Sequence, residues 1–561
     1  MKKPVIIIGS VLVALVIILG VYFIFVKDKT SQVDNPVVTS APTEAPTQAP
    51  TPTVTPAPED TTQSVLLPAY KKVDGFSKYG YIDQTGTFVI NPVYDDASDF
   101  QEGVAIVRDG GTQKVIDSTG AVIFENNDTI LPFHNGMAAF ISLKEDTSLY
   151  GYIDLKGQVV IEPGYIFADN FNEAGQAYVA LPGGKSYQLI DKTGKVLESY
   201  EVDLEGGYAY AFEDGYILYY GNDTMRYGVK KVDGTTILEA KYSALSYLGH
   251  DLFGVKSPDL ETYEATFDPF ALFNAQGEQL TDYTLYDLQH FSGDYSSASN
   301  DSYVYFIDTK GQEITTLPSY DGSGKLTLMG DVVKAEVDGS LAYYRLDNTV
   351  LWKDDATTYL DNGITVKELK FKPLRSVMVR YPQVEGLADS AVQKQVNEQL
   401  ESLFTESRAN ITVEEGLSVD DSFVATQTKN LLTIAMSGYD YYEGAAHGMP
   451  IREYYFIDIT TGEFYDFKDL FLKGSNYADV INEFIRSAIT SGDPDQNMYF
   501  PENFTGIADS QHFYLSENGI VIYFYPYDIA AYAAGFPEFD ISFDQLRDSI
   551  NTDGAFWKAF H

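Results

Sequence analysis

The chain has 561 residues, with 38 Lys and Arg against 81 Asp and Glu, which gives a formal net charge of −43, and it contains no cysteine. A polyanion of this size lacks the clustered Lys and Arg that release counterions from a phosphate backbone, so we expect no nucleic-acid partner. Without cysteine there are no disulfides, zinc–cysteine sites or thiol nucleophiles. The hydrophobic content of 44% suffices for buried cores, and the length predicts more than one domain.

An apolar run at residues 4–26 follows Lys2 and Lys3. It has about the 20 residues with which a helix crosses roughly 30 Å of hydrocarbon. The run is longer than the apolar region of a typical cleavable signal and has no small residues at its end, so it predicts a transmembrane anchor or an uncleaved signal. The two lysines place residues 1–3 in the cytoplasm and the bulk of the chain outside. We therefore expect a single-pass protein of the cell membrane, although the sequence does not decide whether the segment is cleaved.

Residues 27–64 are dominated by Thr, Pro, Ala and Val. Such a composition cannot bury enough apolar surface to fold and favours extended, polyproline-like conformations. The segment is predicted to be a disordered stalk that separates the rest of the chain from the membrane.

A short motif recurs along residues 65–355. The string Tyr-Gly-Tyr-Ile-Asp-x-x-Gly occurs at 79–86 and 150–157, and related Asp or Asn positions follow at intervals of 34 to 42 residues. They are positions 83, 117, 154, 191, 233, 274, 308 and 347. Short β-rich runs between Gly, Pro and Asp predict three or four strands per unit. We expect a mostly β repeat domain of about seven to eight units, propeller-like or an open β array.

The recurring core of each unit, Asp-x-x-Gly, has two interpretations. Asp before Gly begins many calcium loops, but one carboxylate per loop supplies too few ligands for a calcium cage. Asp can instead hydrogen-bond the backbone ahead of it, while Gly adopts the positive φ that closes a short hairpin. We predict structural turns and no metal at Asp83, Gly86, Asp117, Gly120, Asp154, Gly157, Asp191, Gly194, Asp308 and Gly311.

The unit also contains a Pro-x-Tyr-Asp-x-Ala stretch, as at residues 92–97. Together with the turn, this pattern resembles the WG repeat of bacterial surface proteins, with Tyr in place of Trp at Tyr79, Tyr150 and Tyr227. The exchange of one large aromatic residue for another suggests a packing anchor. The resemblance implies a scaffold or binding surface and brings no established chemistry.

The apolar period changes to a helical one in residues 366–561, which predicts an α+β domain. Helices are expected at 387–404, at 480–489 and after Ser542, which forms a capping box with Gln545. Strands are expected at 431–436, 453–458, 463–467 and in a hairpin around 518–519.

Several landmarks in this domain occur together, at residues 381–386, 443–448, 456–471 and 525–535. They resemble the extracytoplasmic domain of the RsiV-type lysozyme-sensing anti-sigma factors, which is also fused to some peptidoglycan deacetylases. The resemblance implies a wall-side domain that in some relatives binds a lysozyme. Residues 1–3 leave no room for a sigma-binding domain, and no His-x-x-x-His motif of a deacetylase occurs, so neither activity is carried over.

One segment of this domain combines aromatic, acidic and imidazole side chains. An acid/base or metal site would require its carboxylates and imidazole to converge, whereas a structural His would bond the loop backbone. Tyrosines there offer large amphipathic contact area to sugars or cationic partners. The candidate ligand-binding residues are Tyr439, Asp440, Tyr441, Tyr442, Glu443 and His447.

No motif for a catalytic nucleophile, a phosphate loop or a dinucleotide occurs, so we expect no cofactor and no catalytic residue. We expect a membrane-anchored binding, sensing or scaffold protein of the bacterial cell envelope. Its expected partner is a cationic protein such as a lysozyme, which long-range attraction favours, or a cell-wall component. An enzyme acting on cell-wall glycan or peptide and an adhesive surface protein remain open as alternatives, and the sequence does not give the oligomeric state.

Overall fold

The computed structural model describes residues 65–73, 76–144, 147–257, 268–491 and 498–561. The expected cytoplasmic tip, anchor or signal, and stalk at residues 1–64 lie outside these residues. Within the described part of the chain, no helix is both long enough and apolar enough to cross a membrane.

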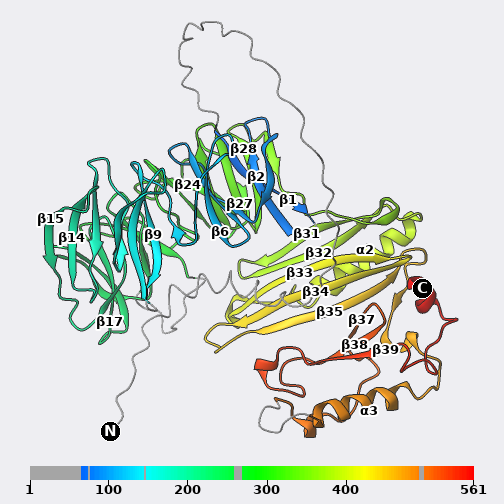
Figure 1. Ribbon diagram of the computed structural model, residues 1–561. Helices are drawn as coiled ribbons and strands as arrows, with labels where there is room; N and C mark the ends of the chain where they lie inside the picture. The colour runs from blue at the N-terminus through cyan, green and yellow to red at the C-terminus, as the bar shows by residue number, and fades with distance from the viewer. Residues whose placement is uncertain (1–64, 74–75, 145–146, 258–267, 492–497) are drawn as a thin grey trace, which may run out of the picture. The chain divides into compact units, whose positions relative to one another are not determined.

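Residues 67–353 form eight successive small sheets, each made of three or four strands that are consecutive in the chain (Figure 1). The first four sheets contain β1 (Leu67–Val73), β2 (Phe76–Ile82) and β3 (Phe88–Tyr94); β4 (Asp96–Ala97), β5 (Val104–Asp109), β6 (Thr112–Asp117) and β7 (Val122–Asn126); β8 (Thr129–Ile130), β9 (Met137–Lys144), β10 (Thr147–Asp154) and β11 (Val159–Tyr165); and β12 (Phe167–Ala168), β13 (Gln176–Ala180), β14 (Ser186–Asp191) and β15 (Val196–Glu201). The last four contain β16 (Tyr208–Glu213), β17 (Tyr216–Gly221), β18 (Arg226–Lys231) and β19 (Thr236–Tyr242); β20 (Leu245–Tyr247), β21 (Leu252–Lys256) and β22 (Phe270–Asn274); β23 (Tyr295–Ser299), β24 (Tyr303–Asp308) and β25 (Tyr320–Asp321); and β26 (Gly324–Met329), β27 (Val332–Val337), β28 (Ser340–Arg345) and β29 (Val350–Lys353). The mostly β repeat region is confirmed, whereas closure of the sheets into a propeller stays a prediction.

By their internal contacts the residues form two compact units. One consists mainly of residues 98–236, and the other of residues 68–97 and 237–561, together with 108–110. The second unit therefore contains the first repeat sheet, the last repeat sheets and the whole C-terminal domain.

Each of the eight sheets carries one turn of the repeated type. The Oδ1 atom of Asp83 accepts hydrogen bonds from the N–H groups of Thr85 (2.8 Å) and Thr87 (3.1 Å), and Gly86 closes the turn with a φ of 80°. A hydrogen bond from the Thr85 hydroxyl (2.6 Å), together with these two backbone bonds, holds the pKa of the Asp83 carboxyl below its usual value. Asp117, Asp154, Asp191, Asn274 and Asp308 make the same two bonds, and Asp233 and Asp347 make the first of them. Each of these side chains therefore binds the backbone of its own turn.

The predicted aromatic anchors make packing contacts, as Tyr150 does with a buried cluster and Tyr79 with Tyr70, but in these two copies the Tyr two positions later is buried more deeply. Tyr152 is 1% exposed, packs on Phe171 and donates a hydrogen bond to the Asp169 carbonyl (2.7 Å), whereas Tyr150 is half-buried. The residue between them must be glycine, because a Cβ on Gly151 would lie 2.6 Å from the carbonyl oxygen of Ile161. Tyr79 and Tyr227 are also half-buried, and Tyr81 is fully buried.

In the second unit the first and last repeat sheets are in contact. The buried hydroxyl of Tyr343 donates to the Pro68 carbonyl (2.7 Å), and the Tyr70 hydroxyl donates to Asp354 (2.8 Å). These bonds join residues 275 and 284 positions apart in the sequence.

A seven-stranded sheet organises the C-terminal domain (Figure 1). Its order is β30 (Thr358–Tyr359), β31 (Thr365–Leu374), β32 (Val377–Glu385), β33 (Leu417–Thr428), β34 (Leu431–Tyr442), β35 (Met449–Asp458) and β36 (Phe464–Tyr465). A three-stranded sheet follows, with β37 (Phe513–Leu515), β38 (Gly519–Tyr523) and β39 (Glu538–Ser542). The α-helices are α2 (Ser390–Thr405), α3 (Tyr477–Thr490) and α4 (Ala555–Phe560), and short 3-10 helices lie at Asp361–Gly363, Val413–Glu415, Phe467–Leu470, Pro501–Asn503 and Tyr532–Ala534.

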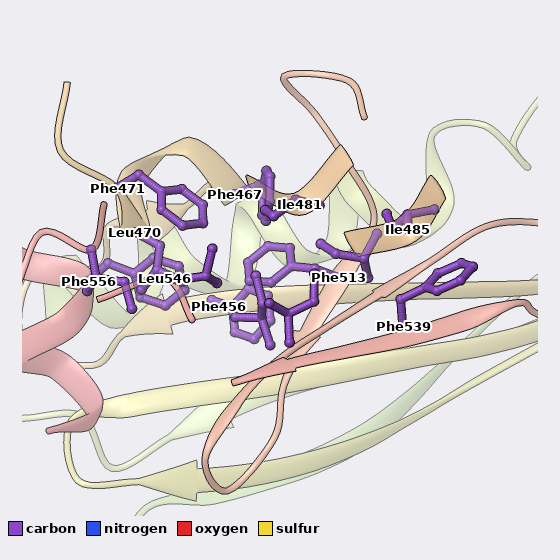
Figure 2. Packing of buried hydrophobic residues seen from close by; sticks show 14 of the residues in the cluster. Phe456, Phe467, Leu470, Phe471, Ile481, Ile485, Phe513, Phe539, Leu546 and Phe556 are labelled. Carbon is purple, nitrogen blue, oxygen red and sulfur yellow. The ribbon is translucent and has the colours of Figure 1, made fainter. Parts of the chain in front are cut away.

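Both faces of the large sheet are buried where β34 begins and β35 ends. Neighbouring residues of a strand point to opposite faces, so Leu432 and Ile457 pack against α2, whereas Leu431 and Phe456 pack on the other side. Figure 2 shows this second core, in which Phe456 lies against Phe513. Because both faces are covered, β34 begins as a continuous apolar run rather than an alternating one.

The helices expected at 387–404 and 480–489 are confirmed as α2 and α3. The prediction of a helix after Ser542 is wrong. Ser542 and Gln545 do form reciprocal capping bonds, with the Gln545 N–H 3.3 Å from the Ser542 hydroxyl. The segment nevertheless forms only turns, because Phe471 forms a β-bridge with Ile550 and the Leu472 N–H bonds the Ser549 carbonyl.

The β31–β32 hairpin joins the C-terminal domain to the last repeat sheets within the second unit. Lys372 forms a 2.5 Å ion pair with Asp338, and Arg375 pairs with Asp287 and donates to the Asn300 carbonyl (3.1 Å). Charged groups therefore contribute to this junction.

Candidate functional site

The candidate residues lie at one end of the β34–β35 hairpin. Tyr439 pairs with Pro450 and Asp440 with Met449, and residues 443–448 connect the two strands. Because side chains alternate along β34, Tyr439 and Asp440 point to opposite faces of the sheet.

His447 is held by its ring and by both ring nitrogens. The ring stacks on Tyr532 with centroids 3.8 Å apart. Its Nδ1 lies 3.1 Å from the Gly448 carbonyl, which can only accept, so Nδ1 carries a proton. In the neutral ring Nε2 then accepts a hydrogen bond from the Tyr527 hydroxyl at 3.0 Å.

Gly448 ties the same rings to the backbone. Its N–H donates to the Tyr439 hydroxyl and its carbonyl accepts from the Tyr532 hydroxyl, both at 2.9 Å. A Cβ at this position would lie 2.5 Å from the Asp440 carbonyl oxygen and 2.5 Å from the Tyr439 ring, so the arrangement requires glycine.

Together Tyr439, His447, Tyr527 and Tyr532 form what we call the tyrosine face. Tyr439 is 43% exposed and Tyr527 is 52% exposed, so the rings are accessible although their hydroxyls are bonded. Burial raises the pKa of Tyr532 to about 12, so its hydroxyl stays neutral and continues to donate at physiological pH. The face offers aromatic rings in fixed orientations.

Asp440 belongs to a different cluster on the opposite side of the sheet. Both of its oxygens accept hydrogen bonds from Arg408, at 2.8 and 2.9 Å. Arg408 Nε also bonds Asp421, which is fully buried, at 3.0 Å. Burial raises the pKa of Asp421 to about 6 although Arg408 opposes the rise. Asp440 therefore serves an ion-pair network and does not converge with His447 on one acid/base or metal pocket.

The other candidates lie in or beside the loop. The Tyr441 hydroxyl donates to the Ala445 carbonyl (3.2 Å), and the Glu443 N–H donates to the Gly416 carbonyl (2.8 Å). Tyr442 is 54% exposed and points to the same face as Asp440. Among the residues that the structure describes, no group of three or more His, Asp or Glu side chains is arranged to hold a metal ion.

The structure adds Tyr527 and Tyr532 to the site. Both lie in the segment 525–535, a sequence landmark for which no binding role was predicted. Tyr527 adopts a φ of 74°, which is uncommon for a residue with a side chain. Sequence spacing could not have paired it with His447, because the two are 80 residues apart.

Two family models match parts of the chain. The WG containing repeat matches residues 79–112 and 150–180, and the family described as Protein of unknown function (DUF3298) matches residues 468–544. The chain thus carries WG repeats and a C-terminal DUF3298 domain, in agreement with the architecture expected from the sequence. The DUF3298 match includes Tyr527 and Tyr532. No curated protein sequence matches the chain.

Solved structures resemble parts of the chain at low identity. They include a member of the DUF3298 family from Bacteroides fragilis, with 15% identity, 35% of this chain and 94% of that chain covered, and a TM-score of 0.25. A DUF3298 family protein from Pseudomonas aeruginosa has 16% identity, with 35% of this chain and 95% of that chain covered, and a TM-score of 0.26. Hsv2 from Kluyveromyces lactis has 13% identity, with 46% of this chain and 92% of that chain covered, and a TM-score of 0.27. Likenesses this distant carry no argument about function.

Proposed function

We propose that this chain is a membrane-anchored extracytoplasmic protein of the bacterial cell envelope that binds, senses or scaffolds and catalyses no reaction. The combination of WG repeats with a DUF3298 domain supports the coarser part of this proposal, a cell-envelope-related extracellular protein. In the proposal, residues 4–26 anchor the chain and residues 27–64 hold the folded part away from the membrane. The eight sheets act as the blades of a propeller, and the Tyr343–Pro68 contact supports its closure.

The observation that carries the binding role is the tyrosine face. Its rings are exposed, yet hydrogen bonds to Gly448 and His447 already hold them in place. A partner therefore meets a rigid surface and loses little side-chain entropy in binding it. Aromatic faces attract cations, and a net charge of −43 attracts cationic proteins over longer distances. We propose a cationic protein such as a lysozyme as the partner, or a cell-wall component.

Capture of lysozyme by the immobilised full chain tests this proposal. Retention at low salt should fall at about 0.5 M salt, because screening shortens the range of the attraction. Tyr527→Ala should weaken capture about tenfold, since exposed aromatic anchors dominate many interfaces. Tyr208→Ala is a matched control, because Tyr208 is 46% exposed but lies in β16 of the repeat region.

Two outcomes would contradict the proposal. If lysozyme is not retained at low salt, the partner is wrong, and if both variants weaken capture equally, the tyrosine face is not the binding surface.

Incubation with cell-wall fragments tests the enzyme alternative in parallel. New products that disappear in the His447→Gln variant would replace the binding role with a catalytic one.

A further inference from the structure

Strand β35 continues past its short partner β36, which pairs only with Phe456 and Ile457. Farther along the same edge, the Arg452 carbonyl accepts a hydrogen bond from the Tyr525 hydroxyl (2.8 Å), and the Arg452 N–H donates to the same hydroxyl (3.2 Å). Tyr454 lies between Arg452 and Phe456. Alternate residues of a strand direct their N–H and carbonyl groups to the same edge, so those of Tyr454 point to the edge where Arg452 bonds Tyr525 and Phe456 pairs with β36. No strand of the described ranges pairs with Tyr454 on that side.

A pocket of about 400 Å³ lies at this gap. Four consecutive residues of β35, 453–456, line it. Successive side chains point to opposite faces, so a pocket that touches all four must lie along the edge of the strand. Its volume falls within the ~300–1,000 Å³ of typical ligand pockets. The remaining lining residues include Asp466 and His512.

The charges and rings of this pocket favour a cation. Glu453 accepts a hydrogen bond from the Tyr525 hydroxyl (3.0 Å) and lies 3.2 Å from Nδ1 of His512. These bonds leave further lone pairs on the carboxylate. Asp466 is a second acidic residue in the lining, and its Oδ2 lies 3.4 Å from the ammonium of Lys468, a residue outside the lining. No Lys or Arg lines the pocket, and eight of its fifteen lining residues are Phe or Tyr. Carboxylates beside aromatic rings are a suitable environment for an ammonium or guanidinium group.

We propose that this pocket binds one short extended segment of a partner protein that carries a Lys or Arg side chain. One residue of the segment exchanges two backbone hydrogen bonds with Tyr454, and the basic side chain of the next residue lies opposite Glu453. A peptide residue fits this pair because its N–H and carbonyl point the same way in an extended chain, whereas those of a single trans amide group point in opposite directions. Directly opposite residues of an antiparallel pair lie ~4.5–5.5 Å apart, close enough for the basic group to reach Glu453.

This inference rests on the proposed function, because the pocket would be one of the sites through which the chain binds a cationic protein. It is distinct from the tyrosine face, since the two use different residues. The peptide experiment below and the lysozyme capture above can therefore fail independently.

Calorimetry with the full chain and the capped tripeptide acetyl-Val-Lys-Val-amide tests the pocket. The same peptide with norleucine in place of Lys keeps the methylene chain and removes the charge, and it should bind about tenfold more weakly. N-methylation of the Val before Lys removes the donor to the Tyr454 carbonyl and should weaken binding by a similar factor.

The variant Glu453→Gln keeps the shape of the side chain and removes its charge. It should lower the affinity for the Lys peptide to that for the norleucine peptide and leave the norleucine affinity unchanged. Glu463→Gln is the matched control, because Glu463 is exposed and does not line the pocket. The unchanged norleucine affinity also shows that the Glu453→Gln pocket is folded.

Three results would overturn the inference: no saturable binding of the Lys peptide at millimolar concentration, equal affinities for the Lys and norleucine peptides, or equal effects of the two Glu variants. If lysozyme is captured while the peptide does not bind, the pocket assignment is wrong and the proposed function stands. If the peptide binds while lysozyme is not captured, the pocket stands and the partner is wrong.

Discussion

Replacing Arg408 by Met should strongly destabilise the C-terminal domain. Arg408 makes three hydrogen bonds of 2.8 to 3.0 Å, two to Asp440 and one to the fully buried Asp421. Met fills a similar volume but leaves a buried carboxylate without its cation. Removing one partner of a buried ion pair costs about 3–5 kcal/mol, less than the sum of the individual bonds, because the remaining groups relax.

The dependence on pH separates this cause from a loss of packing. Burial raises the pKa of Asp421 to about 6, above its value of about 3.9 in an unfolded chain. The folded state therefore binds this proton more tightly, and the free energy of unfolding contributed by Asp421 falls as the pH rises from about 4 to 6. Without Arg408 the pKa should rise further, so the variant should lose this contribution at a higher pH and recover stability on acidification from pH 7.

Urea titrations at pH 7 and pH 5, followed through the fluorescence of the two tryptophans, Trp352 in β29 and Trp557 in α4, measure these effects in the full chain. The double variant Arg408→Met with Asp421→Asn should regain part of the loss, because it removes the fully buried charge and leaves only Asp440, whose side chain is 19% exposed, without its cation. Arg547→Met is the matched control, since Arg547 pairs with Asp544 on the surface, where a pair is worth at most about 1 kcal/mol. The reasoning is refuted if Arg408→Met costs no more than the control, or if the double variant is no more stable than the single one.

Three further predictions concern the repeat region, a histidine and the anchor. Gly151→Ala should lower the free energy of unfolding of its unit by about 1–3 kcal/mol, because the new Cβ would overlap the Ile161 carbonyl at 2.6 Å; urea titration measures it, and a neutral effect would contradict the close approach. The hydrogen bond to Glu453 raises the pKa of His512, so its stabilising contribution is present below the unfolded value of about 6.5 and is lost as the pH rises through the folded value. His512→Gln should remove this pH dependence in thermal melts, and an unchanged profile would count against the pair. Deletion of residues 4–26 should move the chain from the membrane fraction to the soluble fraction on centrifugation, whereas continued sedimentation with membranes would point to another attachment.

Local sequence pattern predicted much of the fold. The repeat spacing predicted about seven to eight units. Each sheet carries the expected type of turn, because the side chain at the first position bonds N–H groups only two to four residues ahead, as Asp83 does. The helical period predicted α2 and α3, since the apolar residues that face each core recur along one side of each helix. The failure after Ser542 has the opposite cause, because the bonds of the segment to Phe471 and Leu472 replaced a helix that its own capping residues favoured.

The candidate site was predicted less completely than the fold. The sequence identified the segment with His447 and Tyr439, because aromatic and imidazole side chains are concentrated there. It did not predict that Asp440 points to the other face, because the expected strand ended at residue 436 whereas β34 continues to Tyr442. Nor could it identify Tyr527, which the later fold of the chain brings to His447.

By itself, then, the sequence determined the approximate repeat number, the turn chemistry, the charge and the change from β repeats to an α+β domain, because all of these depend on composition or on residues close together in the chain. The tertiary structure alone decided the contact of the first repeat sheet with the last, the Arg408 network and the open edge at Tyr454. Each of these depends on distant segments meeting in one register. The free-energy cost of a charge or of an unpaired backbone group depends on whether the surrounding segments exclude water from it, and no local sequence pattern specifies that.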